Sequence, residues 1–279
     1  MAFFLLGVFN YIGIEMNINK KEAFELFKKA AGLENAFGIN SLGYCYQNGI
    51  GTDTDHQKAF ESYQKAADYK NASGMNNLGD CYENGIGTDT DHQKAFESYQ
   101  KAADLKNAAG MNNLGDCYRY GTGTDINKQR AFELYKAAAD LKYAPVIKSL
   151  GDCYLLGIGT NINKQSVFEL YKKAANLEYA SGIKGLGDCY QYGIGTNITE
   201  KSAFELYKKA ANLGASGIEF LDKCYQDGIR TGNNQEANLA YCYRYGIGVE
   251  KNEQKTSELY RDVNDQHDLL RLYLNKSVS

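Results

Sequence analysis

The sequence predicts an all-α protein, built as an α/α solenoid of about seven helix-turn-helix repeats. Three observations support this fold class: a fixed 36-residue period, apolar residues at helical spacing, and glycine at regular break points. The segment Gly51–Asp68 recurs unchanged as Gly87–Asp104, 36 residues later. A period of this size is typical of stacked repeats, in which no unit buries its apolar face alone.

Phenylalanine and cysteine extend this period along most of the chain. The phenylalanines are Phe24, Phe60, Phe96, Phe132, Phe168 and Phe204, and the cysteines are Cys45, Cys81, Cys117, Cys153, Cys189 and, one residue early, Cys224. Cys242 follows Cys224 after only half a period. We therefore expect one solenoid over residues 1–279, with a truncated first repeat (1–37), regular repeats (38–227) and an irregular C-terminal part with a cap (228–279).

Each unit contains two predicted helices. In the first helix, Met75, Leu78, Cys81 and Tyr82 fall on one face, and Gly85 follows as a left-handed C-cap. The second helix is represented by Lys58–Ala67, whose apolar residues have the spacing i, i+1, i+4, i+7, i+8. We expect an aspartate to act as its N-cap, at Asp55 and again at Asp91.

Small residues recur where the two helices of a unit must approach each other. On the first helix they are Gly43, Gly79, Gly115, Gly151 and Gly187. Glycine inside a helix costs about 1 kcal/mol relative to alanine, so its recurrence indicates a packing requirement. Isoleucines in the loops are expected to fill the gaps between units, at Ile50, Ile86, Ile158, Ile194 and Ile247.

Composition excludes several classes of function. The formal net charge is −3, with 31 Lys and Arg against 34 Asp and Glu, which does not suit nucleic-acid binding. No run of about 18 apolar residues is present, so we expect no membrane insertion. The apolar stretch Ala2–Ile14 is similar to part of a signal peptide, but it has no preceding basic residue and fits the repeat register.

The seven cysteines do not form a disulfide framework. Equivalent residues in stacked helices lie about 8–10 Å apart, whereas a disulfide needs Cα atoms within about 7 Å. We expect buried, reduced thiols and a cytoplasmic protein, with the possible pairing of Cys224 and Cys242 left open.

Other motifs give no catalytic, cofactor-binding or metal-binding residues. The Gly-x-Gly pairs lack the third glycine and the strand of a dinucleotide site. His56 and His92 have no partner at metal-ligand spacing, and Asp53 and Asp55 lack the rest of a calcium loop.

Tyrosine supplies the candidate partner-binding residues. Tyr120, Tyr192 and Tyr245 share one repeat position that other units fill with different residues, and Tyr143 and Tyr179 share another. Tyrosine is favoured at interfaces because it buries a large area at low entropic cost. Packing at the edge of the core explains these tyrosines equally well.

The pattern LGxCYxxGxGT followed by KAFExYxKAA resembles the Sel-one-like repeat (SLR) family, whose α/α units are related to tetratricopeptide repeats. The copies are Leu78–Ala103, Leu114–Ala139, Leu150–Ala175 and Leu186–Ala211. The resemblance implies a right-handed superhelix and a non-catalytic adaptor that binds a protein or peptide on its concave face. The partner's identity and the oligomeric state stay open.

The chain departs from the family pattern where the second helix ends. The family has glycine there, whereas this chain has Glu34, Lys70, Lys106, Lys142 and Glu178. We expect the following asparagines, Asn35, Asn71 and Asn107, to supply the left-handed residue instead.

Two alternatives to the adaptor remain. One is a regulatory repeat region of a larger, kinase-associated signalling protein, although no kinase motif occurs in the chain. The other is a β-lactamase-like hydrolase, because Ser62 and Lys65, and again Ser98 and Lys101, match S-x-x-K. The remaining elements of that signature, S-D-N and K-T-G, are missing from the sequence.

Overall fold

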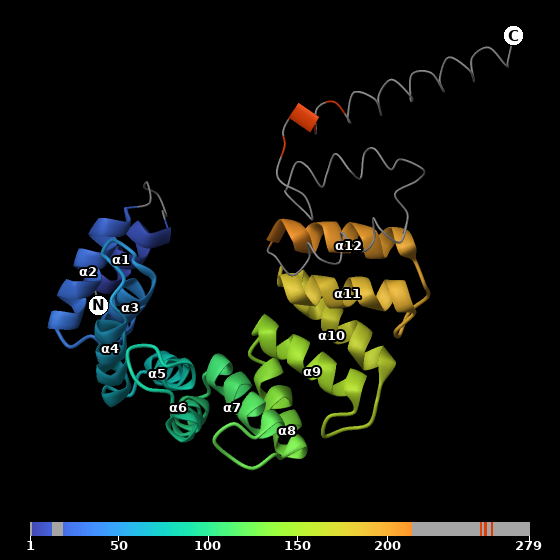
Figure 1. Ribbon diagram of the computed structural model, residues 1–279, viewed down its shortest axis with the longest axis horizontal. Helices are drawn as coiled ribbons and strands as arrows, with labels where there is room; N and C mark the ends of the chain where they lie inside the picture. The colour runs from blue at the N-terminus through green and yellow to red at the C-terminus, as the bar shows by residue number, and fades with distance from the viewer. Residues whose placement is uncertain (1, 13–18, 214–251, 253, 256–257, 259–279) are drawn as a thin grey trace, which may run out of the picture. The chain divides into compact units, whose positions relative to one another are not determined.

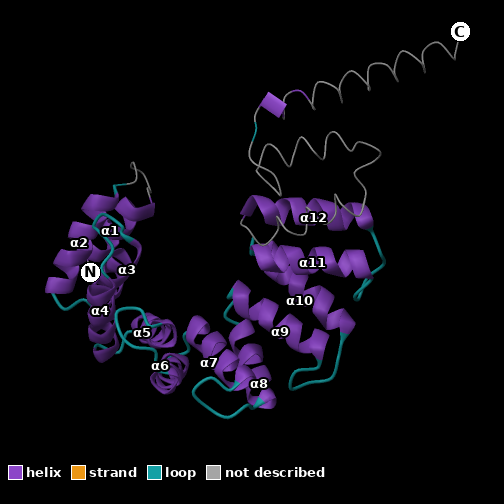
Figure 2. Ribbon diagram, in the orientation of Figure 1, coloured by secondary structure: helices purple, strands orange, loops and turns teal. Residues whose placement is uncertain are grey.

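The computed structural model describes residues 2–12, 19–213, 252, 254–255 and 258 (Figure 1). Its described elements are twelve α-helices: α1 (Ala2–Ile12), α2 (Lys20–Gly32), α3 (Ala36–Asn48), α4 (His56–Asp68), α5 (Ala72–Asn84), α6 (His92–Asp104), α7 (Ala108–Tyr120), α8 (Lys128–Ala139), α9 (Ala144–Leu156), α10 (Lys164–Asn176), α11 (Ala180–Tyr192) and α12 (Glu200–Leu213). No strand occurs in the described residues (Figure 2). The all-α prediction is confirmed.

The chain divides into two compact units, Met1–Ile162 and Asn163–Ser279. The first contains α1–α9, and the described part of the second contains α10–α12. Within the first unit every helix packs against the next, and α3, α5, α7 and α9 also contact one another in succession. The odd-numbered helices therefore form one layer, and the even-numbered helices form the other.

The predicted caps are present. Asp91 Oδ1 accepts a hydrogen bond from the Lys94 backbone N–H at 3.0 Å, and so begins α6. Gly85 ends α5 in the left-handed conformation, with φ of 68°. These caps satisfy backbone groups that the helix leaves without partners. They also fix where each helix begins and ends.

The prediction for the end of the even-numbered helices was wrong. The left-handed residues are Glu34, Lys70, Lys106, Lys142 and Glu178, with φ between 56° and 58°. Asn71 has φ of −78° instead, and its Oδ1 accepts a hydrogen bond from the Gly74 N–H at 2.7 Å. The next helix begins immediately, so the asparagine is needed as its extended N-cap and the preceding residue must turn the chain.

Tyrosines from the even-numbered helices fill the core of each repeat. Tyr63, Tyr99 and Tyr135 are fully buried. A Cβ atom on Gly79 would lie 2.5 Å from Cε1 of Tyr99, so only glycine leaves room for the ring. Equivalent contacts join Gly43 to Tyr63 and Gly115 to Tyr135. The recurring glycines therefore have the packing role that their period indicates.

The five cysteines in the described repeats are buried free thiols: Cys45, Cys81, Cys117, Cys153 and Cys189. Burial raises the pKa of Cys81 to about 12 and that of Cys45 to about 11. Their prediction as small core residues is confirmed. Cys224 and Cys242, with the irregular C-terminal part, lie outside the described residues.

The described part of the first helix, α1, packs against α2. In the part of the chain that the structure describes, no helix is long and apolar enough to cross a membrane.

Candidate functional site

One side of the odd-numbered helices carries the side-chain hydrogen bonds that join α3, α5, α7 and α9 in the first unit. We name it the odd-helix face and define it by five positions, which in α3 are Asn40, Ser41, Tyr44, Gln47 and Asn48. This spacing places them on one stripe of the helix. The equivalents are Asn76, Asn77, Asp80, Glu83 and Asn84 in α5, Asn112, Asn113, Asp116, Arg119 and Tyr120 in α7, and Lys148, Ser149, Asp152, Leu155 and Leu156 in α9.

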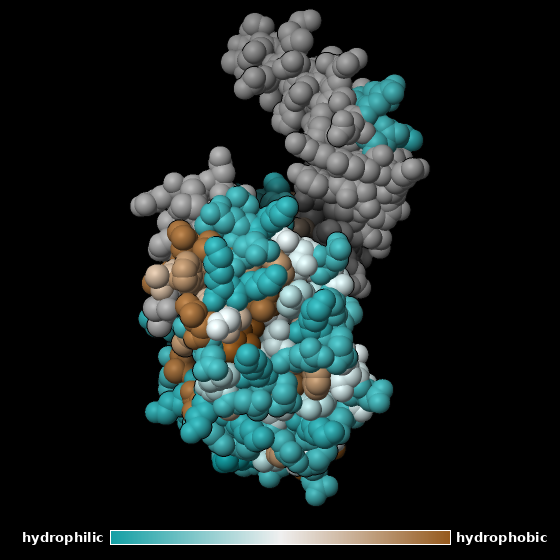
Figure 3. Space-filling model, turned by 90° about the vertical axis from the view of Figure 1, so that its left-hand side faces the viewer, coloured by the Kyte–Doolittle hydropathy of each residue, from teal (hydrophilic) through white to brown (hydrophobic). Residues whose placement is uncertain are grey.

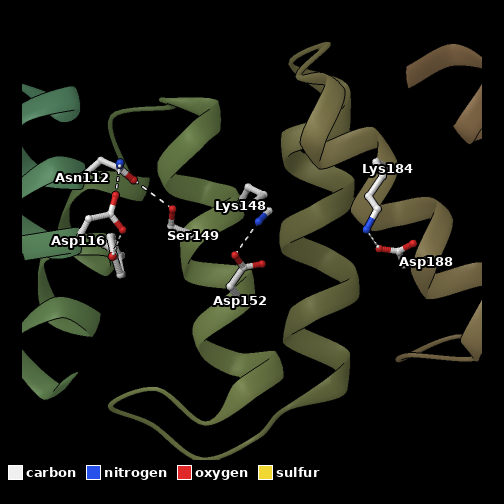
Figure 4. Close-up of polar contacts among 8 residues, drawn as sticks. Asn112, Asp116, Lys148, Ser149, Asp152, Lys184 and Asp188 are labelled. Atoms are coloured by element: carbon white, nitrogen blue, oxygen red, sulfur yellow. Dashed lines mark hydrogen bonds and ion pairs between the residues drawn. The ribbon is translucent and has the colours of Figure 1, made fainter. Parts of the chain in front are cut away.

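Side-chain hydrogen bonds cross this face from helix to helix. Asn77 Nδ2 donates to Asn40 Oδ1 at 3.0 Å, which joins α5 to α3. Asn113 Nδ2 donates to Asn76 Oδ1 at 3.1 Å and so joins α7 to α5. The hydroxyl of Ser149 continues the series by donating to Asn112 Oδ1 at 3.1 Å (Figure 4). These bonds fix the register of neighbouring repeats.

Each buried tyrosine of the next helix holds a group on the face. The phenol of Tyr99 lies 2.8 Å from Asp80 Oδ1 and 2.9 Å from Glu83 Oε2. The phenol of Tyr135 donates to Asp116 Oδ1 at 2.7 Å. Because these rings are locked in the core, the carboxylates have fixed positions.

The carboxylates are only partly compensated. Burial raises the pKa of Asp80, the hydrogen bond from Tyr99 lowers it, and the charge of Glu83 raises it. Burial also raises the pKa of Asp116, but there Tyr135 and the guanidinium of Arg119 act in the opposite direction. Two carboxylates that compete for one phenol proton cannot both be satisfied by it.

Charge along the face varies by helix. In α9, Lys148 Nζ lies 2.7 Å from Asp152 Oδ2, and an equivalent pair joins Lys184 to Asp188 in the second unit (Figure 4). Among the described residues, no ion pair involves the acidic side chains of α5. On the odd-helix face, α5 therefore carries two acidic side chains and no basic one, whereas in α7 Arg119 lies near Asp116.

The candidate tyrosines occupy different places. Tyr120 is 62% exposed at the C-terminal end of α7, with the Arg119 guanidinium 4.9 Å from its ring centroid. Tyr192 is equally prominent in α11, where it is 57% exposed. Tyr143 is the half-buried N-cap residue of α9. Since α7 and α9 run in register, Tyr120 and Tyr143 lie at opposite ends of the layer, about 20 Å apart along the helices.

Two candidates lie outside this comparison. Tyr179 begins α11 in the second unit, as a half-buried N-cap residue, and Tyr245 falls outside the described residues. A binding role for any of the five tyrosines stays a prediction. Of the five, Tyr120 lies on the odd-helix face as defined above.

The serines of the S-x-x-K motifs are engaged by their own helices. Ser62 Oγ donates to the Lys58 carbonyl at 2.7 Å, and Ser98 Oγ donates to the Lys94 carbonyl at 2.7 Å. A nucleophilic hydroxyl needs a hydrogen bond to a base instead. Within residues that the structure describes, no group of three His, Cys, Asp or Glu side chains is placed to hold a metal. The polar and charged side chains of the odd-helix face can instead form hydrogen bonds and ion pairs with another molecule.

The asparagines and carboxylates of this face were not predicted from the sequence. A signal was present, because Asn-Asn-Leu-Gly-Asp occurs at Asn76–Asp80 and again at Asn112–Asp116. Its polar residues follow the helical period beside the core leucine and cysteine. Their bonds to neighbouring repeats depend on how the helices stack, which spacing within one helix does not specify.

The stacked α/α units and the hydrogen bonds between them define the class of helical solenoid repeat proteins. Within that class, the chain belongs to the Sel1 repeat family: the family model matches residues 2–35, 36–68, 72–107, 108–143, 149–179, 180–214 and 236–261. The seven matches confirm the resemblance and the expected number of repeats.

Solved structures share the fold. A Sel1 repeat protein from Oxalobacter formigenes is 24% identical, with a TM-score of 0.66 over 94% of this chain and 96% of that one. A protective antigen of uropathogenic Escherichia coli that displays an SLR fold is 26% identical, with a TM-score of 0.64 over 95% of this chain. This chain spans only 61% of that antigen. No curated protein matched.

Proposed function

We propose that this protein is a non-catalytic scaffold that binds a protein or peptide segment on the odd-helix face. Sel1-repeat proteins are generally protein-interaction scaffolds. The observation that carries the proposal is the change of chemistry along this face while the core stays constant. One position is Gln47 in α3, Glu83 in α5, Arg119 in α7 and Leu155 in α9. The two positions before it are cysteine and tyrosine in each of these four helices.

A surface whose side chains differ from helix to helix suits recognition of a polypeptide. Core positions must keep their size because a stacked repeat has to match its neighbours. Side chains outside the core are free to differ, and each helix then offers a different contact. The odd-numbered helices also contact one another directly, which makes theirs the more closely spaced layer and supports a concave binding face.

The buried free thiols support a second part of the proposal, that the protein works in a reducing compartment such as the cytoplasm. Buried thiols that lie one repeat apart do not form disulfides with each other. They would therefore add no covalent stabilisation in an oxidising compartment. A reducing compartment also suits repeats that are held together by packing and hydrogen bonds, without a disulfide among the described residues.

The test is quantitative affinity capture of the full chain from its source cells. A face variant carries Glu83→Ala, Arg119→Ala and Leu155→Ala. A matched control carries Glu61→Ala, Glu97→Ala and Glu133→Ala, which occupy one exposed position of the even-numbered helices. Both variants change three residues that share a repeat position, and circular dichroism verifies that both remain folded.

We expect a stoichiometric partner that the wild type and the control retain and the face variant loses by about tenfold or more, since a few residues carry most of the energy of an interface. Equal retention by both variants would contradict the proposal, as would selective loss in the control.

A further inference from the structure

An apolar pocket lies at the N-terminal end of the odd-helix face. It has a volume of about 150 Å³, and Val8, Tyr11, Phe27 and Tyr44 supply its apolar walls. The rings of Tyr11 and Tyr44 meet edge-on, with centroids 6.4 Å apart. Figure 3 views this end of the molecule and shows apolar surface gathered on one side of it. An apolar cavity of about 150 Å³ holds a group the size of benzene.

The pocket exists because the first repeats depart from the later ones. Tyr44 is 44% exposed at a position that is aspartate in the next odd-numbered helices, as at Asp80 and Asp116. In α1 the equivalents of polar positions are apolar too: Leu5 takes the place of Ser41 and is 46% exposed. An exposed aromatic side chain at the mouth of a cavity, such as Tyr44, is typical of an interaction site.

The pocket adjoins the two acids of α5, Asp80 and Glu83, which have no ion pair among the described residues. Asn40 belongs to the pocket wall and accepts the hydrogen bond from Asn77, one helical turn from Asp80. Asn76 Nδ2 in turn donates to Asp80 Oδ2 at 3.2 Å. Glu83 lies on the same stripe, and its only described hydrogen bond is the one it shares with Asp80 through the Tyr99 phenol. A cationic group would satisfy the second carboxylate.

We propose, on the basis of the proposed function, that this end of the face binds a segment in which a bulky apolar side chain is followed closely by lysine or arginine. The apolar side chain fills the pocket between Tyr11 and Tyr44. The cation pairs with Asp80 and Glu83. Charge complementarity selects this partner, because in the described part of α3 and α5 the face carries acidic groups and no basic one.

The probes are four fluorescein-labelled peptides of a glycine-serine backbone. They combine phenylalanine or alanine with two lysines or two glutamates a few residues further on. Binding to the full chain is followed by fluorescence anisotropy at low salt. We expect the peptide with phenylalanine and lysine to bind about tenfold more tightly than that with alanine and lysine, and at least about fivefold more tightly than that with phenylalanine and glutamate.

Two variants assign these preferences to their residues. Tyr44→Asp introduces the residue that later repeats place there beside a buried tyrosine, so it suits the fold and removes a pocket wall. It should abolish the preference for phenylalanine. Asp80→Asn combined with Glu83→Gln should abolish the preference for lysine, whereas Glu97→Gln, an exposed carboxylate of α6, should leave it unchanged. Thermal melts identify any variant that fails to fold, and high salt should weaken the lysine preference in the wild type.

Equal binding of all four peptides, no binding of any, or preferences that survive in these variants would overturn the inference. In that case the proposed function would still be upheld if the wild type captures a partner that the face variant (Glu83→Ala, Arg119→Ala and Leu155→Ala) loses. Failure of the proposed function itself is recognised separately, by a partner that is insensitive to those substitutions.

Discussion

Asp80 and Glu83 show how a single repeat unit acquires its own chemistry. Both lie within hydrogen-bonding distance of the single phenol O–H of Tyr99, and the equivalent of Glu83 in the next odd-numbered helix is Arg119, whose charge lowers the pKa of Asp116. A change at one half-buried position thus places a basic group beside one aspartate and an acidic group beside the other. The buried tyrosine beneath stays the same.

The first prediction is that Glu83→Gln lowers the pKa of Asp80, because the charge of Glu83 is one of the causes that raise it. A folded pKa above the unfolded one, about 3.9, gives stability that is present below pH 4 and lost as the pH rises through the folded value. The variant should therefore gain a few tenths of a kcal/mol at neutral pH and nothing in acid.

Carboxyl carbon NMR titration and denaturant unfolding at both pH values provide the measurements. Glu97→Gln is the control, since it removes an exposed carboxylate from an even-numbered helix. A pKa of Asp80 that does not fall in Glu83→Gln would show that the two carboxylates do not interact.

At the scale of the helical elements, close approach decides which glycines are required. Gly79→Ala should lower the free energy of unfolding by about 2 kcal/mol, although alanine favours a helix by about 1 kcal/mol. The added Cβ would lie 2.5 Å from a Tyr99 ring that is fully buried and cannot retreat.

Gly32→Ala provides the matched comparison. Gly32 ends α2, and a Cβ atom there would meet nothing within 4 Å. We expect a gain of up to about 1 kcal/mol in chemical denaturation. Equal effects of the two substitutions would refute the close approach of α5 and Tyr99.

A second element-scale prediction concerns the turn between α6 and α7. Lys106 has φ of 58°, a conformation that costs a non-glycine residue roughly 1 kcal/mol, so Lys106→Gly should stabilise the protein by about that amount. Asn107→Gly should destabilise it by a few tenths of a kcal/mol, because Asn107 Oδ1 accepts from the Gly110 N–H at 2.8 Å. The opposite order in thermal denaturation would place the left-handed residue at Asn107.

The same turn shows the limit of reasoning from sequence. Asparagine favours both the N-cap and the left-handed conformation, and composition does not separate the two roles at Asn107. The distance to the next helix separates them, because α7 begins at Ala108. The glycine C-cap at Gly85 has no such competing role and was predicted correctly.

At the scale of the whole molecule, the repeat is evident in the sequence because each unit repeats the same packing problem. Tyr99 and Cys81 recur for that reason, and the all-helical fold follows from them. The odd-helix face is less accessible to prediction. Its hydrogen bonds, such as that from Asn113 to Asn76, join residues 37 apart that become neighbours only when the repeats stack.

Tyr120 illustrates the same point for the candidate site. Its exposure and its position on the face agree with a binding role, while Tyr143 lies at the other end of the layer. Variation between repeats identified both positions. Only the direction of the helices shows that they do not form one compact site.

The proposed function requires that partners bind to the odd-helix face. The most direct measurement is photo-crosslinking in the source cells with p-benzoylphenylalanine in place of Glu83, compared with the same group in place of Glu97 on α6. We predict a crosslinked partner from position 83 of α5 and none from position 97. A partner crosslinked from position 97 alone would contradict the account and assign binding to the layer of even-numbered helices.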